Sequence, residues 1–229
     1  MRVHRFYTGQ AVQLKKDFWV HDEALLWQWS KVLRFREGQE VILFDGEQTD
    51  RLYRILELKK TEAHLTMVTE LERRLPVRHV YLFWSLLKKD NNDFILQKCT
   101  ELGVSNFVPL LTERSIRDNF NIDRARKIVQ EASEQCGRSN IPAVREPMHV
   151  QTALREYKDK VKFFICEQGS EAPTKLQKHE RYGIFIGPEG GWSDAEKQLF
   201  QSEKLAHLHI NDFTLRAETA AIVASAKLL

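Results

Sequence analysis

The chain has 229 residues, of which 42% are hydrophobic and 29% charged, and its formal net charge is +3. Its 10 glycines and 6 prolines are too few for a collagen-like or a Pro/Gly-rich disordered chain. The longest stretch without a charged residue, Leu102 to Thr112, is too short for a helix that crosses a bilayer. Residues 1–20 lack the apolar segment and cleavage site of a signal peptide. We therefore expect a cytoplasmic α/β or α+β protein that crosses no membrane.

The three cysteines are Cys99, Cys136 and Cys166, an odd number with no Cys-x-x-Cys pair. A disulfide framework or a zinc site is therefore not expected, and no metal is predicted. We expect buried, reduced thiols, because a free cysteine usually packs as a small core residue.

Basic and acidic side chains are balanced along the chain, with 13 and 12 in residues 1–75 and 22 and 20 in residues 76–229. A protein that coats DNA nonspecifically would carry a larger basic excess. Binding of a nucleic acid would instead depend on a local patch, because local charge steers binding. One such patch is predicted near the amino terminus, from Arg2, His4, Arg5, Lys15 and Lys16.

Before residue 76 the sequence predicts short strands. The apolar run Val41–Phe44 ends at an Asp-Gly dipeptide, which is common in hairpin turns. Leu52–Leu58 and Ala63–Leu71 nearly alternate between apolar and polar side chains, as strands do. Asp22–Val32 has apolar residues at helical spacing. One helix among several short strands predicts a small β-barrel, followed by a linker at Glu72–Pro76.

After residue 76 the predicted strands alternate with helices. Strands are expected at 80–84, 106–111, 161–166, 183–186 and 205–210, and helices at 93–102, 124–136, 194–204 and 217–229. This alternation favours crossover units in a mostly parallel sheet. Ligands of such sheets bind beyond the carboxyl ends of the strands, so the junctions between strand and helix are the places to look for chemistry.

The richest junction is the segment 184–196. An apolar strand runs into Gly187-Pro188-Glu189-Gly190-Gly191, and the Ser193-x-x-Glu196 pattern that follows is a capping box that begins a helix. The glycines allow backbone N–H groups to approach a ligand closely. Neither the Walker spacing nor Gly-x-Gly-x-x-Gly is present, so a nucleotide phosphate site is not predicted. Taken alone, this motif also fits an ordinary turn between strand and helix.

A second junction begins the last predicted helix. Arg216, Glu218 and Thr219 crowd its start, and small residues such as Ala220 and Ala221 follow. Small side chains allow the backbone to pack closely against another helix or a ligand. The alternative is a capped C-terminal helix with a local ion pair.

Five motifs in a fixed order connect these segments to a known family. They are Lys88 with Gln97-Lys98 and Glu101–Val104, Thr112–Ser115, Glu131–Arg138 with Pro142, Gly187–Trp192, and Leu215–Ala220. With the opening Arg2–Tyr7, this pattern resembles that of the bacterial 16S ribosomal RNA uridine-N3-methyltransferases, the RsmE family of the SPOUT superfamily. The resemblance covers essentially the whole chain.

The resemblance implies both a fold and an activity. The implied fold is α/β: a small PUA-like β-barrel for RNA in residues 1–73, then a SPOUT methyltransferase domain in residues 74–229 with a mostly parallel sheet and a trefoil knot. The implied activity is that of a homodimer that holds S-adenosylmethionine in a bent conformation. Its implied substrate is N3 of uridine 1498 of 16S rRNA, within the assembled 30S subunit.

The resemblance also implies site residues. The cofactor-binding residues are expected at the two junctions: Gly187, Pro188, Glu189, Gly190, Gly191, Ile210, Phe213, Thr214, Leu215, Thr219 and Ala220. The RNA-binding residues are expected to be Arg2, Arg5, Arg114 and Arg138. S-adenosylmethionine has no phosphate, so backbone groups and apolar walls suit it better than a lysine would.

Arg216 and Glu218 are the predicted catalytic residues. N3 of uracil carries a proton at pH 7, which must leave as the methyl group arrives, so negative charge develops on the base. Arg216 would stabilise that charge by a charge-assisted hydrogen bond. Glu218 or Glu189 would take the proton, directly or through water, and the choice between them is left open. Glu218 has a second interpretation, as a residue that only caps the last helix and orients Arg216.

At the last junction the sequence departs from the family pattern. Asn211 stands where the family usually has a glycine, and Phe213 where it has an arginine. Asparagine tolerates the left-handed conformation better than most residues, so the turn is expected to survive, whereas a contact of the arginine is lost. Two alternatives remain: another SPOUT methyltransferase, acting on tRNA or on a ribose 2′-hydroxyl, and a non-catalytic RNA-binding assembly factor.

Overall fold

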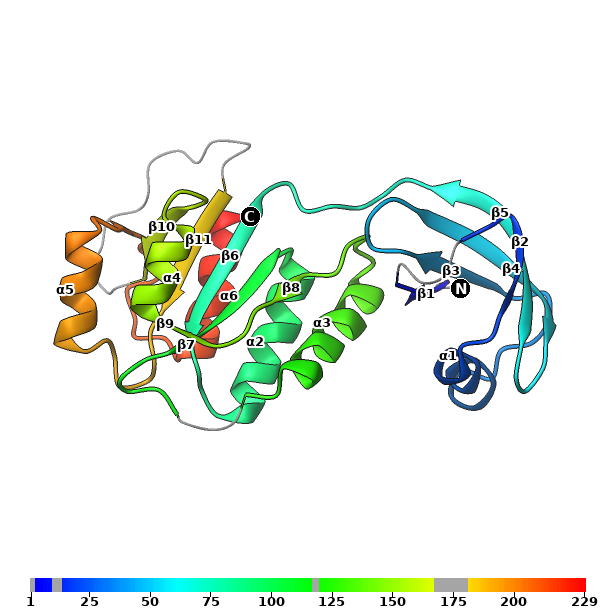
Figure 1. Ribbon diagram of the computed structural model, residues 1–229, viewed down its shortest axis with the longest axis horizontal. Helices are drawn as coiled ribbons and strands as arrows, with labels where there is room; N and C mark the ends of the chain where they lie inside the picture. Colours follow the sequence, from blue (N-terminus) through cyan, green and yellow to red (C-terminus); the bar gives the residue numbers. More distant parts are fainter. Residues whose placement is uncertain (1–2, 10–13, 117–119, 167–180) are drawn as a thin grey trace. The chain divides into compact units, whose positions relative to one another are not determined.

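The computed structural model describes residues 3–9, 14–116, 120–166 and 181–229. The chain forms two units (Figure 1). Met1–Leu75 and Ser133–Asn140 make up the first unit, and Pro76–Ala132 and Ile141–Leu229 make up the second. Residues 133–140 thus belong to the first unit, although the chain on either side of them belongs to the second.

The first unit contains a five-stranded sheet with the order β1-β3-β4-β5-β2. β1 pairs with β3 in parallel, and the other neighbours are antiparallel. The strands are β1 (His4–Tyr7), β2 (Asp17–Val20), β3 (Glu40–Phe44), β4 (Asp50–Leu58) and β5 (Ala63–Leu71). The three predicted strands are confirmed as β3, β4 and β5. The edge strands β1 and β2 were not predicted, because four residues are too few to show a period.

One helical segment covers the core of this sheet. The helix α1 (Glu23–Trp27) continues directly into a π-helix, η1 (Gln28–Val32), which confirms the predicted helix. Asp22 begins it, because its carboxylate accepts a hydrogen bond from the backbone N–H of Leu25 at 2.9 Å. Leu26 and Trp29 are buried in the core, together with Phe6, Val41, Leu43, Tyr53, Ile55 and Leu65.

The predicted hairpin turn joins β3 to β4. Gly46 has φ +85°, a conformation that favours glycine. The Asp45 carboxylate accepts hydrogen bonds from the backbone N–H groups of Glu47, Gln48 and Thr49 and from the Thr49 hydroxyl. Partial burial raises the pKa of Asp45, but these hydrogen bonds outweigh it and lower the pKa to about 2.

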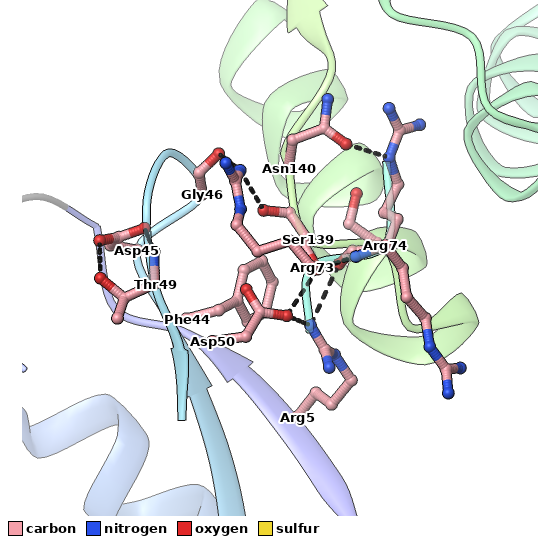
Figure 2. A network of polar contacts seen from close by, with 12 residues as sticks. Arg5, Phe44, Asp45, Gly46, Thr49, Asp50, Arg73, Arg74, Ser139 and Asn140 are labelled. Carbon is pink, nitrogen blue, oxygen red and sulfur yellow. Dashed lines mark hydrogen bonds and ion pairs between the residues drawn. The ribbon is translucent and has the colours of Figure 1, made fainter. Parts of the chain in front are cut away.

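Asp50, the first residue of β4, is the centre of a buried polar network (Figure 2). Its Oδ2 accepts hydrogen bonds from Arg5 Nη2 and from Ser139 Oγ, each at 2.5 Å. The Asp50 side chain is 0% exposed and that of Arg5 is 11% exposed. Ser139 Oγ accepts a hydrogen bond from the Arg74 N–H, and the Ser139 N–H donates to the Arg74 carbonyl. Arg73 Nη2 donates to the carbonyls of Gly46 and Ser139. These contacts hold the segment 133–140 in the first unit.

The second unit contains a seven-stranded, fully parallel sheet with the order β12-β10-β11-β6-β7-β8, and β9 also pairs with β7. The central strands are β6 (His79–Ser85), β7 (Asn106–Leu111), β10 (Lys162–Ile165) and β11 (Arg181–Ile186). The short strands are β8 (Ala143–Val144), β9 (Met148–His149) and β12 (Ala206–His207). The prediction of a parallel α/β sheet is confirmed.

Helices cover both faces of this sheet (Figure 1). One face packs against α2 (Lys89–Leu102), α3 (Ile122–Cys136) and α6 (Ala217–Leu228). The other packs against α4 (Val150–Tyr157) and α5 (Asp194–Ser202). Among the described residues, no helix combines the length and the apolar character that a membrane span requires.

Four elements of this unit differ from the prediction. The strands β8 and β9 were not predicted, because two residues are too few to show a period. Helix α4 was not predicted, although its buried residues Val150, Ala153, Leu154 and Tyr157 have helical spacing. The predicted strand 205–210 pairs only at Ala206 and His207, because its partner β10 ends at Ile165. The Leu208 N–H still donates to the Ile165 carbonyl at 2.9 Å, and after it the chain turns toward α6.

The buried ion pair between Arg5 and Asp50 yields a stability prediction. Asp50→Asn removes the charge but keeps the size, so the nearly buried Arg5 guanidinium loses the carboxylate with which it pairs. We expect a loss of about 3–5 kcal/mol in the free energy of unfolding of the first unit, measured by urea denaturation. The matched control is Glu40→Gln, which breaks an exposed pair with Arg54 and should change little. Equal effects of the two substitutions would contradict the structural role of Asp50.

Candidate active site

A cavity of about 810 Å³ lies at the carboxyl ends of the parallel strands in the second unit. Its volume is within the usual range of small-molecule sites. The walls are formed by the loop after β11 and by the start of α6, which are the two junctions singled out in the sequence. The lining residues are Arg114, Cys166, Ile186, Gly187, Pro188, Glu189, Gly190, Gly191, Trp192, Lys197, Thr214, Leu215, Arg216, Ala217 and Ala220.

The loop after β11 owes its shape to two of its three glycines. A Cβ at Gly187 would lie 3.0 Å from the Trp192 indole, so a side chain there is excluded unless the ring moves. Gly191 has φ +70°, and its N–H donates to the Pro188 carbonyl at 2.9 Å, which closes a tight turn. At Gly190, by contrast, a Cβ would make ordinary van der Waals contact with Arg114.

Trp192 anchors this loop to the core. Its side chain is buried and packs edge-on against Phe200 of α5, with ring centroids 4.8 Å apart. The capping box that follows is confirmed: Ser193 Oγ accepts from the backbone N–H of Glu196, and the Glu196 carboxylate accepts from the N–H of Ser193. The loop is therefore fixed at its end by both packing and hydrogen bonds.

The second wall of the cavity is the segment that leads into α6. Arg216 occupies the N-cap position, and its exposed side chain lines the cavity, as do Thr214 and Leu215. Asn211 does not adopt the left-handed conformation that was expected of it. Instead its side-chain oxygen accepts a hydrogen bond from the N–H of Phe213 at 2.9 Å, so a side-chain turn replaces the family glycine.

The two candidate bases differ in their surroundings. Glu189 is exposed and lines the cavity. Glu218 is only 9% exposed, does not line the cavity, and has one carboxylate oxygen without a hydrogen-bond partner among the described residues. Glu218 lies in the first turn of α6, where a negative charge is favoured by the helix dipole.

Most of the residues expected at the cofactor site lie together on the cavity wall. Ile210, Phe213 and Thr219 do not line it, and the Phe213 ring is 80% exposed. Five lining residues were not predicted from the sequence: Cys166, Ile186, Trp192, Lys197 and Ala217. Trp192 and Ala217 lie inside the motifs, and Ile186 directly precedes one. Cys166, whose pKa is raised to about 12 by burial, follows the neighbouring strand β10, so the position of that strand in the sheet was needed to find it.

The arginines expected to bind RNA have diverse environments. Arg2 lies outside the described residues. Arg5 is paired with buried Asp50, so we assign it a structural role. Arg138 is buried, which lowers its pKa to about 10, and its Nε donates to Asn140. Arg114 lines the cavity and donates from Nη1 to the Gly190 carbonyl at 2.9 Å.

Comparisons with known proteins agree on one family. Residues 73–229 match the model of the RNA methyltransferase domain, and residues 31–68 match that of the RNA methyltransferase PUA domain. A ribosomal RNA small subunit methyltransferase E from Rickettsia conorii is 26% identical, over 97% of this chain and 91% of the relative.

Two solved structures are similar over nearly the full length. One is a ribosomal RNA small subunit methyltransferase E from Neisseria gonorrhoeae bound to S-adenosyl methionine, with a TM-score of 0.89, 27% identity, and coverage of 98% of this chain and 96% of that one. The other is a putative methyltransferase from Legionella pneumophila in complex with its cofactor, with a TM-score of 0.86, 28% identity, and coverage of 100% and 97%. The chain belongs to the RNA methyltransferase family.

Proposed function

We propose that this protein is an S-adenosylmethionine-dependent methyltransferase that modifies N3 of a uridine in small-subunit ribosomal RNA, uridine 1498 of 16S rRNA. The observation that carries the proposal is the cavity between the glycine loop after β11 and the start of α6. Relatives named for small-subunit rRNA methylation, and a similar structure with the cofactor bound, support it.

The chemistry of the cavity wall fits S-adenosylmethionine. Ile186, Leu215, Ala217 and Ala220 are apolar, and the glycine loop presents backbone groups. The cofactor has no phosphate, and the loop lacks the lysine of phosphate-binding loops. When bound, it supplies a methyl group on a positively charged sulfur.

The charges around the cavity point to a second, anionic ligand. Arg114, Lys197 and Arg216 line it, against a single carboxylate, that of Glu189. S-adenosylmethionine has a net positive charge, and its one carboxylate can pair with at most one of these three cations. The phosphate backbone of RNA accounts for the remaining basic excess, because it is densely negative and attracts Lys and Arg. The cavity is therefore suited to a cationic methyl donor and a polyanionic acceptor together.

The reaction replaces the N3–H bond of uracil by an N3–CH3 bond, and the proton must leave. Arg216 stabilises the negative charge that develops on the base, since its guanidinium is exposed at the cavity. Glu189 is the base that the geometry favours, because it lines the cavity whereas Glu218 is buried beside it. Glu218 then stabilises the first turn of α6, the helix that positions Arg216.

The remaining parts of the proposal follow from the family. The protein acts in the cytoplasm as a homodimer on the assembled 30S subunit. Residues 1–73 contact RNA and residues 74–229, with their chain end in a trefoil knot, carry the cavity. Binding of 16S rRNA by the whole protein then brings the target uridine to Arg216.

The identity of the product tests the proposed reaction. Small subunits from a strain that lacks this protein should gain one 3-methyluridine per 16S rRNA when incubated with the protein and S-adenosylmethionine, as measured by nucleoside mass spectrometry. A 2′-O-methylated nucleoside, or modification of tRNA instead, would replace the proposal by a related activity. Cofactor binding without any product would indicate an assembly factor.

The glycine loop offers a matched pair of substitutions for cofactor binding. Gly187→Ala places a methyl group 3.0 Å from the Trp192 indole and shifts the wall of the cavity. Gly190→Ala adds the same methyl group where there is room for it. We expect at least about tenfold weaker S-adenosylmethionine binding for Gly187→Ala, because packed interiors resist even one added methyl group, and a smaller change for Gly190→Ala. Calorimetric titration measures the S-adenosylmethionine affinity of both variants. A larger loss of affinity for Gly190→Ala than for Gly187→Ala would show that the loop does not form the wall of the cofactor site.

Single-turnover methyl transfer tests the roles of Arg216 and the two glutamates. Arg216→Lys keeps the charge but loses the planar fork, so the rate should fall by roughly two to three orders of magnitude while cofactor affinity changes little. Glu189→Gln should slow transfer with a defect that shrinks at higher pH, where uridine loses its proton unaided. Glu218→Gln is the comparison and should show a pH-independent defect. A pH-dependent defect confined to Glu218→Gln would make Glu218 the base.

A further inference from the structure

Two loops that leave neighbouring parts of the sheet edge are linked by side chains. The turn Thr112–Ser115 follows β7, and the loop 187–193 follows β11. Strand β6 lies between β7 and β11 in the sheet, so the loops begin two strand spacings apart, about 10 Å. At that distance the two strands do not pair with each other, and the links described here are made by side chains.

Arg114 makes the first of the two links. Its Nη1 donates to the Gly190 carbonyl at 2.9 Å. The stem of the side chain runs beside the same residue, with Cδ and Cβ within 3.6 Å of the place a Gly190 Cβ would take. Arg114 therefore contacts Gly190 both by a hydrogen bond to a charged donor and by van der Waals packing.

Glu196 makes the second link. Its side chain is nearly buried, and the two carboxylate oxygens have different partners. Oε2 accepts from the N–H of Ser193 at 2.8 Å, and Oε1 accepts from the N–H of Glu113 at 3.1 Å. A capping box requires only the first of these bonds. The second reaches a residue 83 positions away in the chain, and it joins the start of α5 to the turn after β7.

The turn that holds these two links is itself rigid. Ser115 Oγ donates to the Thr112 carbonyl and accepts from the Thr112 N–H, at 2.9 and 3.1 Å. The N–H of Ile116 donates to the carbonyl of Leu86, which follows β6. The turn is thus attached to the sheet on one side and to the glycine loop on the other.

We infer that Arg114 and Glu196 are positioning residues that hold the glycine loop in the shape required for cofactor binding. A loop with three glycines loses much conformational entropy when it is ordered. Two links to a rigid turn, one at Gly190 and one at the start of α5, reduce that cost before the ligand arrives. The inference rests on the proposed function in that the ligand of the loop is taken to be S-adenosylmethionine.

The test uses Arg114→Met and Arg114→Lys in the full-length protein. Methionine keeps most of the packing against Gly190 but cannot donate a hydrogen bond, whereas lysine can still donate one. We expect S-adenosylmethionine binding about tenfold weaker for Arg114→Met, from the loss of one hydrogen bond with a charged donor, and largely restored for Arg114→Lys. KM for the cofactor should rise in step with the dissociation constant measured without RNA. Arg124→Met is the matched control, because Arg124 is an exposed arginine paired with Asp93 elsewhere in the unit.

Hydrogen exchange of the loop amides in the cofactor-free protein tests the positioning role of Arg114 and Glu196 separately from the identity of the cofactor. Glu196→Gln has a single side-chain oxygen and can accept only one of the two hydrogen bonds that Glu196 accepts. Both Arg114→Met and Glu196→Gln should speed exchange at residues 189–193 without lowering the melting temperature of the second unit. Unchanged exchange with unchanged affinity would overturn the positioning role while wild-type binding still stands. Failure of wild-type protein to bind S-adenosylmethionine, with faster loop exchange in the variants, would overturn the proposed cofactor but not the links.

Discussion

The placement of β11 between β6 and β10 is the constraint on which the cavity depends. β11 is paired in parallel on both sides, and its Gly183 lies under the side chains of Phe163, Phe83 and Val161. A Cβ there would come within 2.9 Å of all three. The missing side chain allows the aromatic layer to close over the strand, where Phe83 stacks on Phe185 with centroids 4.7 Å apart. A strand held so firmly delivers Gly187 to a fixed point at the edge of the sheet, and the cavity is built from there.

The two units use charge in opposite ways. In the first unit the buried carboxylate of Asp50 accepts hydrogen bonds from Arg5 and Ser139, and these contacts hold the segment 133–140. In the second unit Lys197 and Arg216 line an open cavity with one carboxylate among the lining residues. A buried, paired arginine stabilises structure, whereas exposed and unbalanced cations attract an anion. This difference is why we assign Arg5 a structural role and propose a catalytic role for Arg216, although both stood out in the sequence.

The sequence predicted the parallel sheet and both walls of the cavity, because those features are local. The periodic spacing of apolar residues, the spacing of the glycines and the capping box at Ser193 can each be recognised within about a dozen residues of sequence. Contacts between distant residues were not visible: nothing near Arg5 in the chain indicates that its partner is Asp50, or that Ser139 completes the network. The second bond of Glu196 was missed for the same reason, since the capping box already explained that residue. Asn211 was placed correctly in a turn but by the wrong mechanism, because its side chain rather than its backbone replaces the glycine.

We propose the cavity between the glycine loop and the start of α6 as the methyl-donor site. The most direct measurement is amide hydrogen exchange of the wild-type protein with and without saturating S-adenosylmethionine. We expect protection to appear in residues 186–192 and 214–220, on both walls of the cavity, and not in the sheet of the first unit. Protection confined to other parts of the chain, or none at all under conditions where the cofactor is bound, would contradict it.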